Sequence, residues 1–581
     1  MSQSLERKLP EELLDRIVSF TTRKSLLNLC LASKTLNRLA TPYLYSNICL
    51  RETDHLSALA ALLITSPIHA VLVKSLTIPE NWAEGQEEPA EKSWSTQDLA
   101  VHSVLKAKYA EYAPDDSTAH EMCEKIDSGT NEDAIVALLI PNLPELRRLD
   151  INFGILRVHT NFGTMWPTIV QSIRTINNSR LVPIDIMVTG AEDKYFNFSF
   201  HLAHFFHLPN VRSIYGWKLG DDESAPDLDM STFARLKPLS CPVEYIELRS
   251  SKLHADNFQN LIASTIPGRL KTFSYEIGCT WAWFIMEHPR IMNSLQSHHQ
   301  TLEALCLSHE DYYPYDADNE FDKPYPCSFV PFVALKRLKV APVYIWGHEG
   351  FTDKTKLQDP VTKEQLWKAL PANLEELWIT RAYHQEYQEF QSNDVGITFV
   401  PDCLLPSLEL VLQNKLQSFG NLKHLRIELP LFKWEDEWFD ALESLCRTAA
   451  ANGIQSTIIL SDMLDRNTAL TVERLWGWNE DIEWEPVANW QNKECAKIWI
   501  ATTEHQDLAQ VLKDLKSRFL KFTKSFNDAR NEIQKMGQLC SDCRRDPEYR
   551  AHMRVNVAQL ERYIDERLHT KTGWKGRDRD D

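Results

Sequence analysis

A short apolar motif recurs along this chain of 581 residues and constrains its fold more than any other feature. Each copy has an apolar residue, two mostly polar residues, an apolar residue, one variable residue and a further apolar residue. The last three positions alternate between apolar and variable, which favours a short strand with one buried side. The clear copies begin at Leu146, Val243, Leu270, Leu302, Leu335, Leu374 and Leu422, and a degenerate copy begins at Val211.

Stretches with helical spacing separate the copies, among them residues 256–264, 289–297 and 363–370. A strand followed by a helix at this period resembles an irregular leucine-rich-repeat solenoid, in which each unit buries its apolar side only against its neighbours. We therefore expect an α/β fold in which residues 51–462 form an irregular leucine-rich-repeat-like solenoid of strand–helix units. An ordinary α/β domain with parallel strands is the alternative.

The first forty-odd residues predict three short helices. The first is expected to begin near Pro10, whose missing N–H costs nothing at that position. Ser33 is a plausible N-cap of the third helix, which Pro42 is expected to end. Helices this short cannot enclose all their leucines, so some apolar side chains need a partner surface in this chain or in another. The apolar stripe of the first helix is Leu13, Leu14, Ile17 and Val18.

This segment resembles the F-box, a docking module of ubiquitin-ligase complexes. The likeness runs without a gap from Leu9 to Ala40 and includes a Leu-Pro-x-Glu-Leu-Leu start. The sequence departs from the family at Thr21, where an apolar residue is usual, and at Leu36, where many members carry Trp. The resemblance implies that residues binding a Skp-type adaptor are among Leu9, Pro10, Leu13, Leu14, Ile17, Leu26, Leu27, Leu36 and Leu39.

Residues 1–50 are therefore expected to form an F-box-like module, and residues 39–48 are similar to the segment after the F-box in many fungal members. The resemblance implies a non-catalytic substrate-recognition subunit of a cullin-type (SCF) ubiquitin ligase in the ubiquitin conjugation pathway. It would bind the adaptor, and through it the cullin, with the F-box, and an unknown target protein with the repeats. The alternatives are a leucine-rich-repeat scaffold without a ligase role and a hydrolase with an unrecognised site.

Composition narrows the function classes and the compartment. A formal net charge of −18 argues against a nucleic-acid partner bound by phosphate neutralisation. The 12 cysteines are scattered and mostly single, which is typical of reduced thiols in a cytoplasmic or nuclear protein. No signal peptide is visible and no apolar run approaches twenty residues, so no membrane span is expected.

Three long insertions interrupt the motif, at residues 80–96, 309–326 and 383–399. The second mixes aromatic and acidic residues, a composition found in recognition surfaces, although such residues can equally pack on the repeats. Its candidates for target contact are Tyr312, Tyr313, Tyr315 and Tyr325.

The C-terminal region departs from the motif. Residues 463–570 are predicted to form a Trp-rich cap and a helical hairpin, with a partner-binding coiled coil as the alternative. Residues 571–581 are predicted to be disordered.

Known catalytic patterns are missing from the sequence. It has no Gly-rich phosphate loop, no Gly-x-Ser-x-Gly and no His-Glu-x-x-His. Cys540 and Cys543 form a single Cys-x-x-Cys pair, which is too little for a zinc site. We therefore expect no catalytic residue, no metal and no cofactor.

Overall fold

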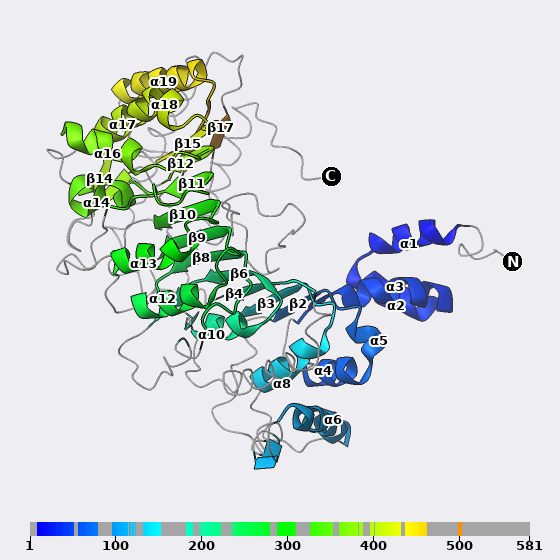
Figure 1. Cartoon of the computed structure of the whole chain (residues 1–581). Coiled ribbons are helices and arrows are strands. Elements are labelled where there is room, and N and C mark those ends of the chain that lie inside the picture. The colour runs from blue at the N-terminus through cyan, green and yellow to red at the C-terminus, as the bar shows by residue number, and fades with distance from the viewer. Residues whose placement is uncertain are drawn as a thin grey trace, which may run out of the picture. The chain divides into compact units, whose positions relative to one another are not determined.

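The computed structural model describes the N-terminal helices and most of the region that carries the recurring motif (Figure 1). All described residues belong to the compact unit Met1–Glu504, one of two such units in the chain. They are residues 9–50, 56–78, 96–113, 116–117, 119–120, 123, 132–152, 182–189, 197–198, 200–221, 233, 236–278, 287–309, 326–352, 359–380, 383–386, 396–399, 401–430, 436–461 and 498–501.

The chain begins with three short helices, as predicted. They are α1 (Glu11–Ser19), α2 (Arg23–Ala32) and α3 (Lys34–Ser46). The Ser33 hydroxyl accepts a hydrogen bond from the Leu36 N–H at 3.1 Å, so Ser33 is the N-cap that the sequence indicated. The prediction that Pro42 ends the third helix is wrong, because α3 continues through Pro42 to Ser46. A proline removes only one helical hydrogen bond, and here the flanking turns of α3 hold together without it.

A single sheet of 13 strands follows within the described part of the chain, and its strand order is the order of the sequence. Every neighbouring pair is parallel except the last, in which β17 is antiparallel to β16. The strands are β1 (Asn47–Cys49), β2 (Ser75–Ile78), β3 (Arg148–Asn152), β4 (Ile184–Thr189), β6 (Val211–Trp217), β8 (Tyr245–Ser251), β9 (Thr272–Ile277), β10 (Ala304–His309), β11 (Arg337–Val340), β12 (Glu376–Ile379), β15 (His424–Pro430), β16 (Gln455–Ser461) and β17 (Ile498–Ala501).

Two further strand pairs lie apart from this sheet. The short strands β5 (Asn197–Phe198) and β7 (Leu219–Gly220) pair in parallel. Within the third predicted insertion, β13 (Tyr383–Glu386) and β14 (Gly396–Phe399) form an antiparallel pair.

Helices lie between many of the successive strands in the described part of the chain, so the architecture is α/β with a parallel sheet. Consecutive helices pack together, α12 on α13, α14 on α16, α16 on α17 and α17 on α19, and Figure 1 shows them along one side of the sheet. None of the described helices is both long enough and apolar enough to span a membrane. The helices are α4 (Leu56–Thr65), α5 (Pro67–Ala70), α6 (Thr96–Tyr112), α8 (Glu132–Leu139), α10 (Phe200–Ala203), α12 (Ala255–Ser264), α13 (His288–Leu295), α14 (Val343–Thr352), α16 (Pro360–Ala369), α17 (Pro401–Gln413), α18 (Lys415–Ser418) and α19 (Asp436–Ala451), with short 3₁₀ turns at Ile140–Asn142, His204–His207 and Gln296–His298.

The recurring motif supplies the core between sheet and helices. All seven predicted copies end in strands, and their second apolar positions lie in register, for example Phe273 beside Leu305 and Leu305 beside Leu338. The Phe258 ring of α12 packs edge-on against Phe273 at a centroid distance of 5.6 Å, which places this ladder on the helix side. The fully buried ladder is Leu76, Leu149, Ile186, Ile214, Ile246, Phe273, Leu305, Leu338 and Leu377, with Leu425 almost fully buried.

Sequence reasoning missed two strands that belong to this ladder. Residues 73–78 match the motif fully and end in β2, while residues 186–188 match its last three positions and lie in β4. Leu76 and Ile186 lie in register on either side of Leu149. The first copy was detectable from Val73, Leu76 and Ile78 alone.

A charged residue comes just before each of the central strands, and its sign alternates from one strand to the next. The backbone N–H of Lys336 donates to the Glu303 carbonyl at 2.9 Å, and the Lys336 Nζ lies 2.8 Å from the Glu303 carboxylate. The same arrangement recurs at 3.6 Å between Lys423 and Glu375. Opposite charges at adjacent positions therefore support the order in which the repeats pair. The series, defined here as the charge ladder, is Glu244, Lys271, Glu303, Lys336, Glu375 and Lys423.

Several predicted segments lie outside the described residues. They are the insertion 80–95, nearly all of 309–326, the tail 571–581, and residues 463–570 except for β17. The predicted Trp-rich cap, hairpin and disordered tail therefore stay predictions.

Candidate interaction surfaces

The three N-terminal helices share a small core of their own. Leu14 and Val18 of α1 and Leu26 of α2 are buried against Leu39 and Ala40 of α3. Burying these side chains contributes roughly 1.5–3 kcal/mol for each large one, which suits a small module with few buried residues. Half-buried apolar side chains surround this core: Leu9, Leu29, Cys30, Leu36, Tyr43 and Leu44.

Other large apolar side chains of α1 and α2 point to solvent. On α1 they follow helical spacing, so Leu13, Ile17 and the helix-ending Phe20 lie along one side. Leu27 and Leu31 of α2 are likewise one turn apart. Single exposed leucines are ordinary, but a set on two consecutive helices that both pack on α3 indicates an interaction site. This N-terminal apolar surface comprises Leu13 at 49% exposure, Ile17 at 51%, Phe20 at 79%, Leu27 at 52% and Leu31 at 81%.

The predicted adaptor-binding residues fall into three groups by exposure. Pro10, Leu13, Ile17 and Leu27 are exposed, and Leu9 and Leu36 are half-buried. Leu14, Leu26 and Leu39 instead lie in the core of the three helices, where they support the surface from beneath. Phe20 and Leu31 were missed by sequence reasoning, although each continues the spacing of its helix.

Two polar links join α1 to α3. The Arg38 guanidinium donates to both Glu11 carboxylate oxygens, at 2.7 and 2.6 Å. The Tyr43 hydroxyl donates to Asp15 Oδ2 at 3.0 Å. These contacts lower the pKa of Glu11 through its hydrogen bonds with Arg38 and raise the pKa of Tyr43 through its hydrogen bond with Asp15. Glu11 and Asp15 are one turn apart, so both links leave the same side of α1.

A second group of polar side chains lies on the sheet face away from the motif's apolar ladders. Side chains alternate along a strand, so the residue between two ladder positions projects to this polar face. Its members are matched in register from strand to strand. We define the polar face by Tyr215, Glu247, Ser274, Cys306, Lys339, Trp378 and Arg426.

Charges and aromatic rings interact closely on the polar face. The Lys339 Nζ lies 3.9 Å from the centroid of the Trp378 ring, and the Arg426 Cζ lies 5.4 Å from it. Such cation–π contacts favour cations that are largely removed from water. At the other end, the Tyr245 hydroxyl donates to Glu247 at 2.6 Å, and Arg249 pairs with Glu247 at 2.5 Å.

Burial shifts the pKa values of acids on this side of the sheet. Desolvation raises the pKa of Asp150 to about 6, against the opposing charge of Arg148, and raises the pKa of the Cys306 thiol to about 11. It also raises the pKa of Glu247, partly offset by Arg249. The side chains of the polar face are themselves buried, except for the half-buried Arg426. The predicted target-contact residues Tyr312, Tyr313, Tyr315 and Tyr325 lie outside the described residues.

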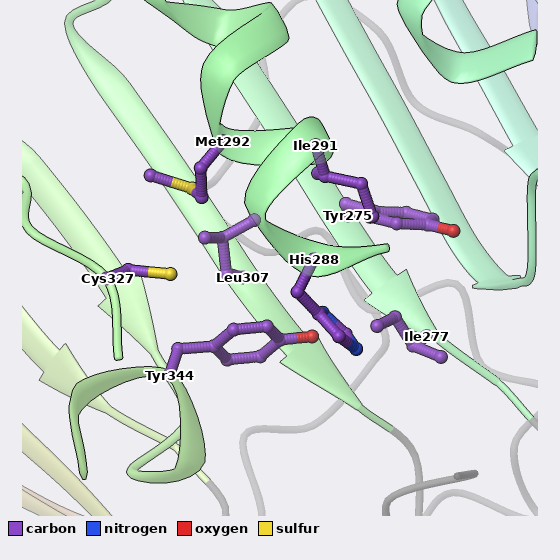
Figure 2. Close-up of a pocket in the computed structure, with 8 residues that line it drawn as sticks. All are labelled: Tyr275, Ile277, His288, Ile291, Met292, Leu307, Cys327 and Tyr344. Atoms are coloured by element: carbon purple, nitrogen blue, oxygen red, sulfur yellow. The ribbon is translucent and has the colours of Figure 1, made fainter. Parts of the chain in front are cut away.

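A small pocket opens between the sheet and helices α13 and α14 (Figure 2). Figure 2 shows the Tyr344 hydroxyl end directed toward His288, and Cys327 beside Leu307. Burial raises the pKa of the Cys327 thiol to about 12, so the thiol is neutral at physiological pH and is a poor nucleophile. The pocket is lined by Tyr275, Ile277, His288, Ile291, Met292, Leu307, Cys327 and Tyr344.

In the described part of the chain, no three His, Cys, Asp or Glu side chains gather as metal ligands. The Cys540–Cys543 pair lies outside that part.

Comparison with known protein families bears on the N-terminal helices. A family model described as F-box-like matches residues 7–51, which span α1, α2, α3 and β1. No curated protein matches the chain. The three helices with their N-terminal apolar surface therefore form an F-box-like domain, and the α/β region comes after it in the chain.

Proposed function

We propose that this chain is a substrate-recognition subunit of a cullin-type (SCF) ubiquitin ligase. In this proposal the N-terminal apolar surface binds a Skp-type adaptor, which links the chain to a cullin. The contact residues are Pro10, Leu13, Ile17, Phe20, Leu27 and Leu31, with Leu9 and Leu36 at the margin. The observation that carries the proposal is the coincidence of the F-box-like match with the exposed apolar side chains of α1 and α2.

The magnitude of apolar burial supports a stable contact. Removing apolar area from water contributes about 25 cal/mol for each Å². Five large side chains, each at least 49% exposed, can together contribute several kcal/mol, which is the scale needed to offset the entropy lost on association.

We infer that the α/β region is an irregular leucine-rich-repeat-like solenoid and that it holds the target protein. Strand order that follows the sequence, and a motif that repeats in register, support this interpretation. For contact with the target we propose Tyr312, Tyr313, Tyr315 and Tyr325. Catalysis then belongs to other subunits, and this chain acts by holding the target close to them. A protein with this role works in the cytoplasm or nucleus.

The proposal is tested by titrating a purified Skp-type adaptor with the full-length protein. In the test variant, Leu13, Ile17 and Leu27 are each replaced by Asp. In the matched control, the exposed apolar residues Leu239 and Val361 of the α/β region are replaced by Asp. We expect the test variant to bind at least 100-fold more weakly and the control to bind like the wild type, with similar unfolding temperatures for all three.

Two results would contradict the proposal. If the test variant and the wild type bound the adaptor equally, the apolar surface would not be the docking site. If the wild type failed to bind any Skp-type adaptor, the chain would be better described as a scaffold whose N-terminal helices only cap the sheet.

A further inference from the structure

The polar links between α1 and α3 occupy the side of α1 opposite its exposed apolar residues. Consecutive residues of an α-helix are about 100° apart around its axis. Glu11 and Asp15 are therefore separated by about 40°, whereas Leu13 and Ile17 lie about 200° and 240° from Glu11. The buried residues Leu14 and Val18 are on the intermediate side. A rotation of α1 that broke both links would swing Leu13 and Ile17 away from their present direction.

Apolar packing alone fixes this rotation weakly. Within α1, Leu14 and Val18 are the buried side chains that anchor the helix to α2 and α3. Packing of aliphatic side chains is non-directional, so a small rotation of α1 changes the buried area little. A bidentate Arg–carboxylate pair, in contrast, has a defined geometry. The pair of Arg38 with Glu11 is of this kind, and the Tyr43–Asp15 bond adds a second fixed point one turn along.

We propose that Arg38 and Tyr43 are positioning residues that hold α1, through Glu11 and Asp15, in the rotation at which Leu13, Ile17 and Phe20 face the adaptor. This inference rests on the proposed function and deepens it. Arg38 and Glu11 are both exposed, so their pair contributes little to the free energy of unfolding. Its main effect falls on the fraction of molecules in which α1 is oriented for binding.

Loss of orientation has a kinetic signature that differs from loss of a contact. When fewer molecules are competent to bind, the apparent affinity falls in proportion to the competent fraction. The association rate constant carries this loss, because the bound complex still has its full set of apolar contacts. A residue that touches the adaptor would change mainly the dissociation rate constant.

The test uses the full-length double variant Arg38→Ala/Tyr43→Phe, which removes both donors without altering α1. Lys34→Ala is the matched control, because it removes one positive charge from an exposed position of α3. By rapid mixing with a Skp-type adaptor, we expect the association rate constant of the double variant to fall about 3- to 10-fold. The dissociation rate constant should stay within twofold of wild type, and the control should match the wild type in both.

A second measurement needs no adaptor. Hydrogen exchange of the free full-length protein should quicken at backbone amides of α1 in the double variant, while the amides of α2 stay unchanged. Arg38→Lys, which keeps the charge but cannot pair bidentately, should give an intermediate exchange rate in α1.

Each contrary outcome has a distinct meaning. Unchanged exchange in α1 would overturn the inference, and so would a faster dissociation with unchanged association, because the side chains would then be contacts and not positioning residues. If the wild type bound no adaptor, the proposed function would fall, while the exchange measurement would still decide whether the two links hold α1.

Discussion

In the parallel sheet, Leu305 lies in a strand with a neighbouring strand on each side, and both Leu305 and its neighbour Leu338 are fully buried. In the F-box-like domain, neighbouring helices cover Leu13 and Leu27 on one side only, and about half of each residue stays exposed. The same residue type thus serves as core in one region and as surface in the other.

The difference teaches that an apolar pattern predicts burial only where the next unit of the fold covers it. A repeat array supplies that cover from both neighbours. Three helices of at most 13 residues cannot supply it, and their uncovered side is where a second protein can bind. Substitutions in the two regions should therefore have separable consequences, on stability in the sheet and on binding in α1 and α2.

The largest effect is expected from Leu305→Ala in the middle of the sheet. Leu305 is fully buried between β9 and β11, so truncation leaves a cavity and should lower the free energy of unfolding by about 2–5 kcal/mol. Denaturant unfolding of the full-length protein measures this loss. A loss below about 1 kcal/mol would show that the ladder is not a continuous core.

Gly216→Ala should be the next most damaging change. Gly216 lies in register between Val188 and Leu248, two residues beyond the ladder position Ile214, and a Cβ there would lie 2.5 Å from Leu219 Cδ1. Overpacking of this kind should lower the free energy of unfolding by about 1–3 kcal/mol. Gly420→Ala is the matched control, because nothing lies within 4 Å of its added Cβ. Equal unfolding temperatures for the two variants would contradict the packing described at β6.

Ile17→Ala tests the opposite side of the comparison. Because Ile17 is half exposed, its truncation should change the free energy of unfolding by less than about 0.5 kcal/mol. Under the proposed function it should weaken binding of a Skp-type adaptor by about tenfold, since a large apolar contact is lost. Calorimetric titration and thermal unfolding measure the two quantities. A variant that lost stability but kept its affinity would reverse the roles assigned to the two regions.

Acidification should weaken the α/β region through His201. Burial, and secondarily the nearby His204, lower the pKa of His201 well below its usual value. Below pH about 6.5 the unfolded chain therefore binds a proton that the folded protein does not, so the stability present above this pH is lost as the pH falls. Between pH 7 and 5.5 the loss should be about 1 kcal/mol.

His201→Phe is the corresponding variant, and unfolding measured across this range should show a flatter pH profile than the wild type. The raised pKa of Asp150 acts in the opposite direction between about pH 4 and 6, and it is common to both proteins. Identical slopes for the two proteins would show that His201 does not contribute.

The smallest effect concerns the charge ladder. Glu303→Lys places a lysine between Lys271 and Lys336, and because these side chains are largely exposed the loss of stability should be less than about 1 kcal/mol. The loss should shrink in high salt, since salt screens exposed charges. Adding Lys336→Glu should recover part of it. A salt-independent loss would point to a packing defect and not to charge.

Much of the fold follows from residue spacing. The motif predicted the strands β3, β6, β8, β9, β10, β11, β12 and β15, because apolar side chains two residues apart share one side of a strand. It failed at β4, where residues 182–189 hold only part of the motif. Helix capping by Ser33 was predicted from its position, whereas the passage of α3 through Pro42 depends on tertiary packing that spacing does not encode.

The candidate sites were only partly accessible from sequence. Spacing identified the apolar stripe of α1 but not which members face inward, since Leu13 and Leu14 are neighbours with opposite exposure. That division depends on where α3 packs. The cation–π contacts of Trp378 and the pairing of Arg38 with Glu11 join residues far apart in sequence, so they required the folded arrangement.

Hydrogen exchange of the full-length protein with and without a Skp-type adaptor tests the central claim most directly. The account predicts that the adaptor slows exchange in α1 and α2, residues 11–32, and leaves the strands β9 to β12 unchanged. No added protection in α1 and α2 under saturating adaptor, or protection confined to the sheet, would contradict it.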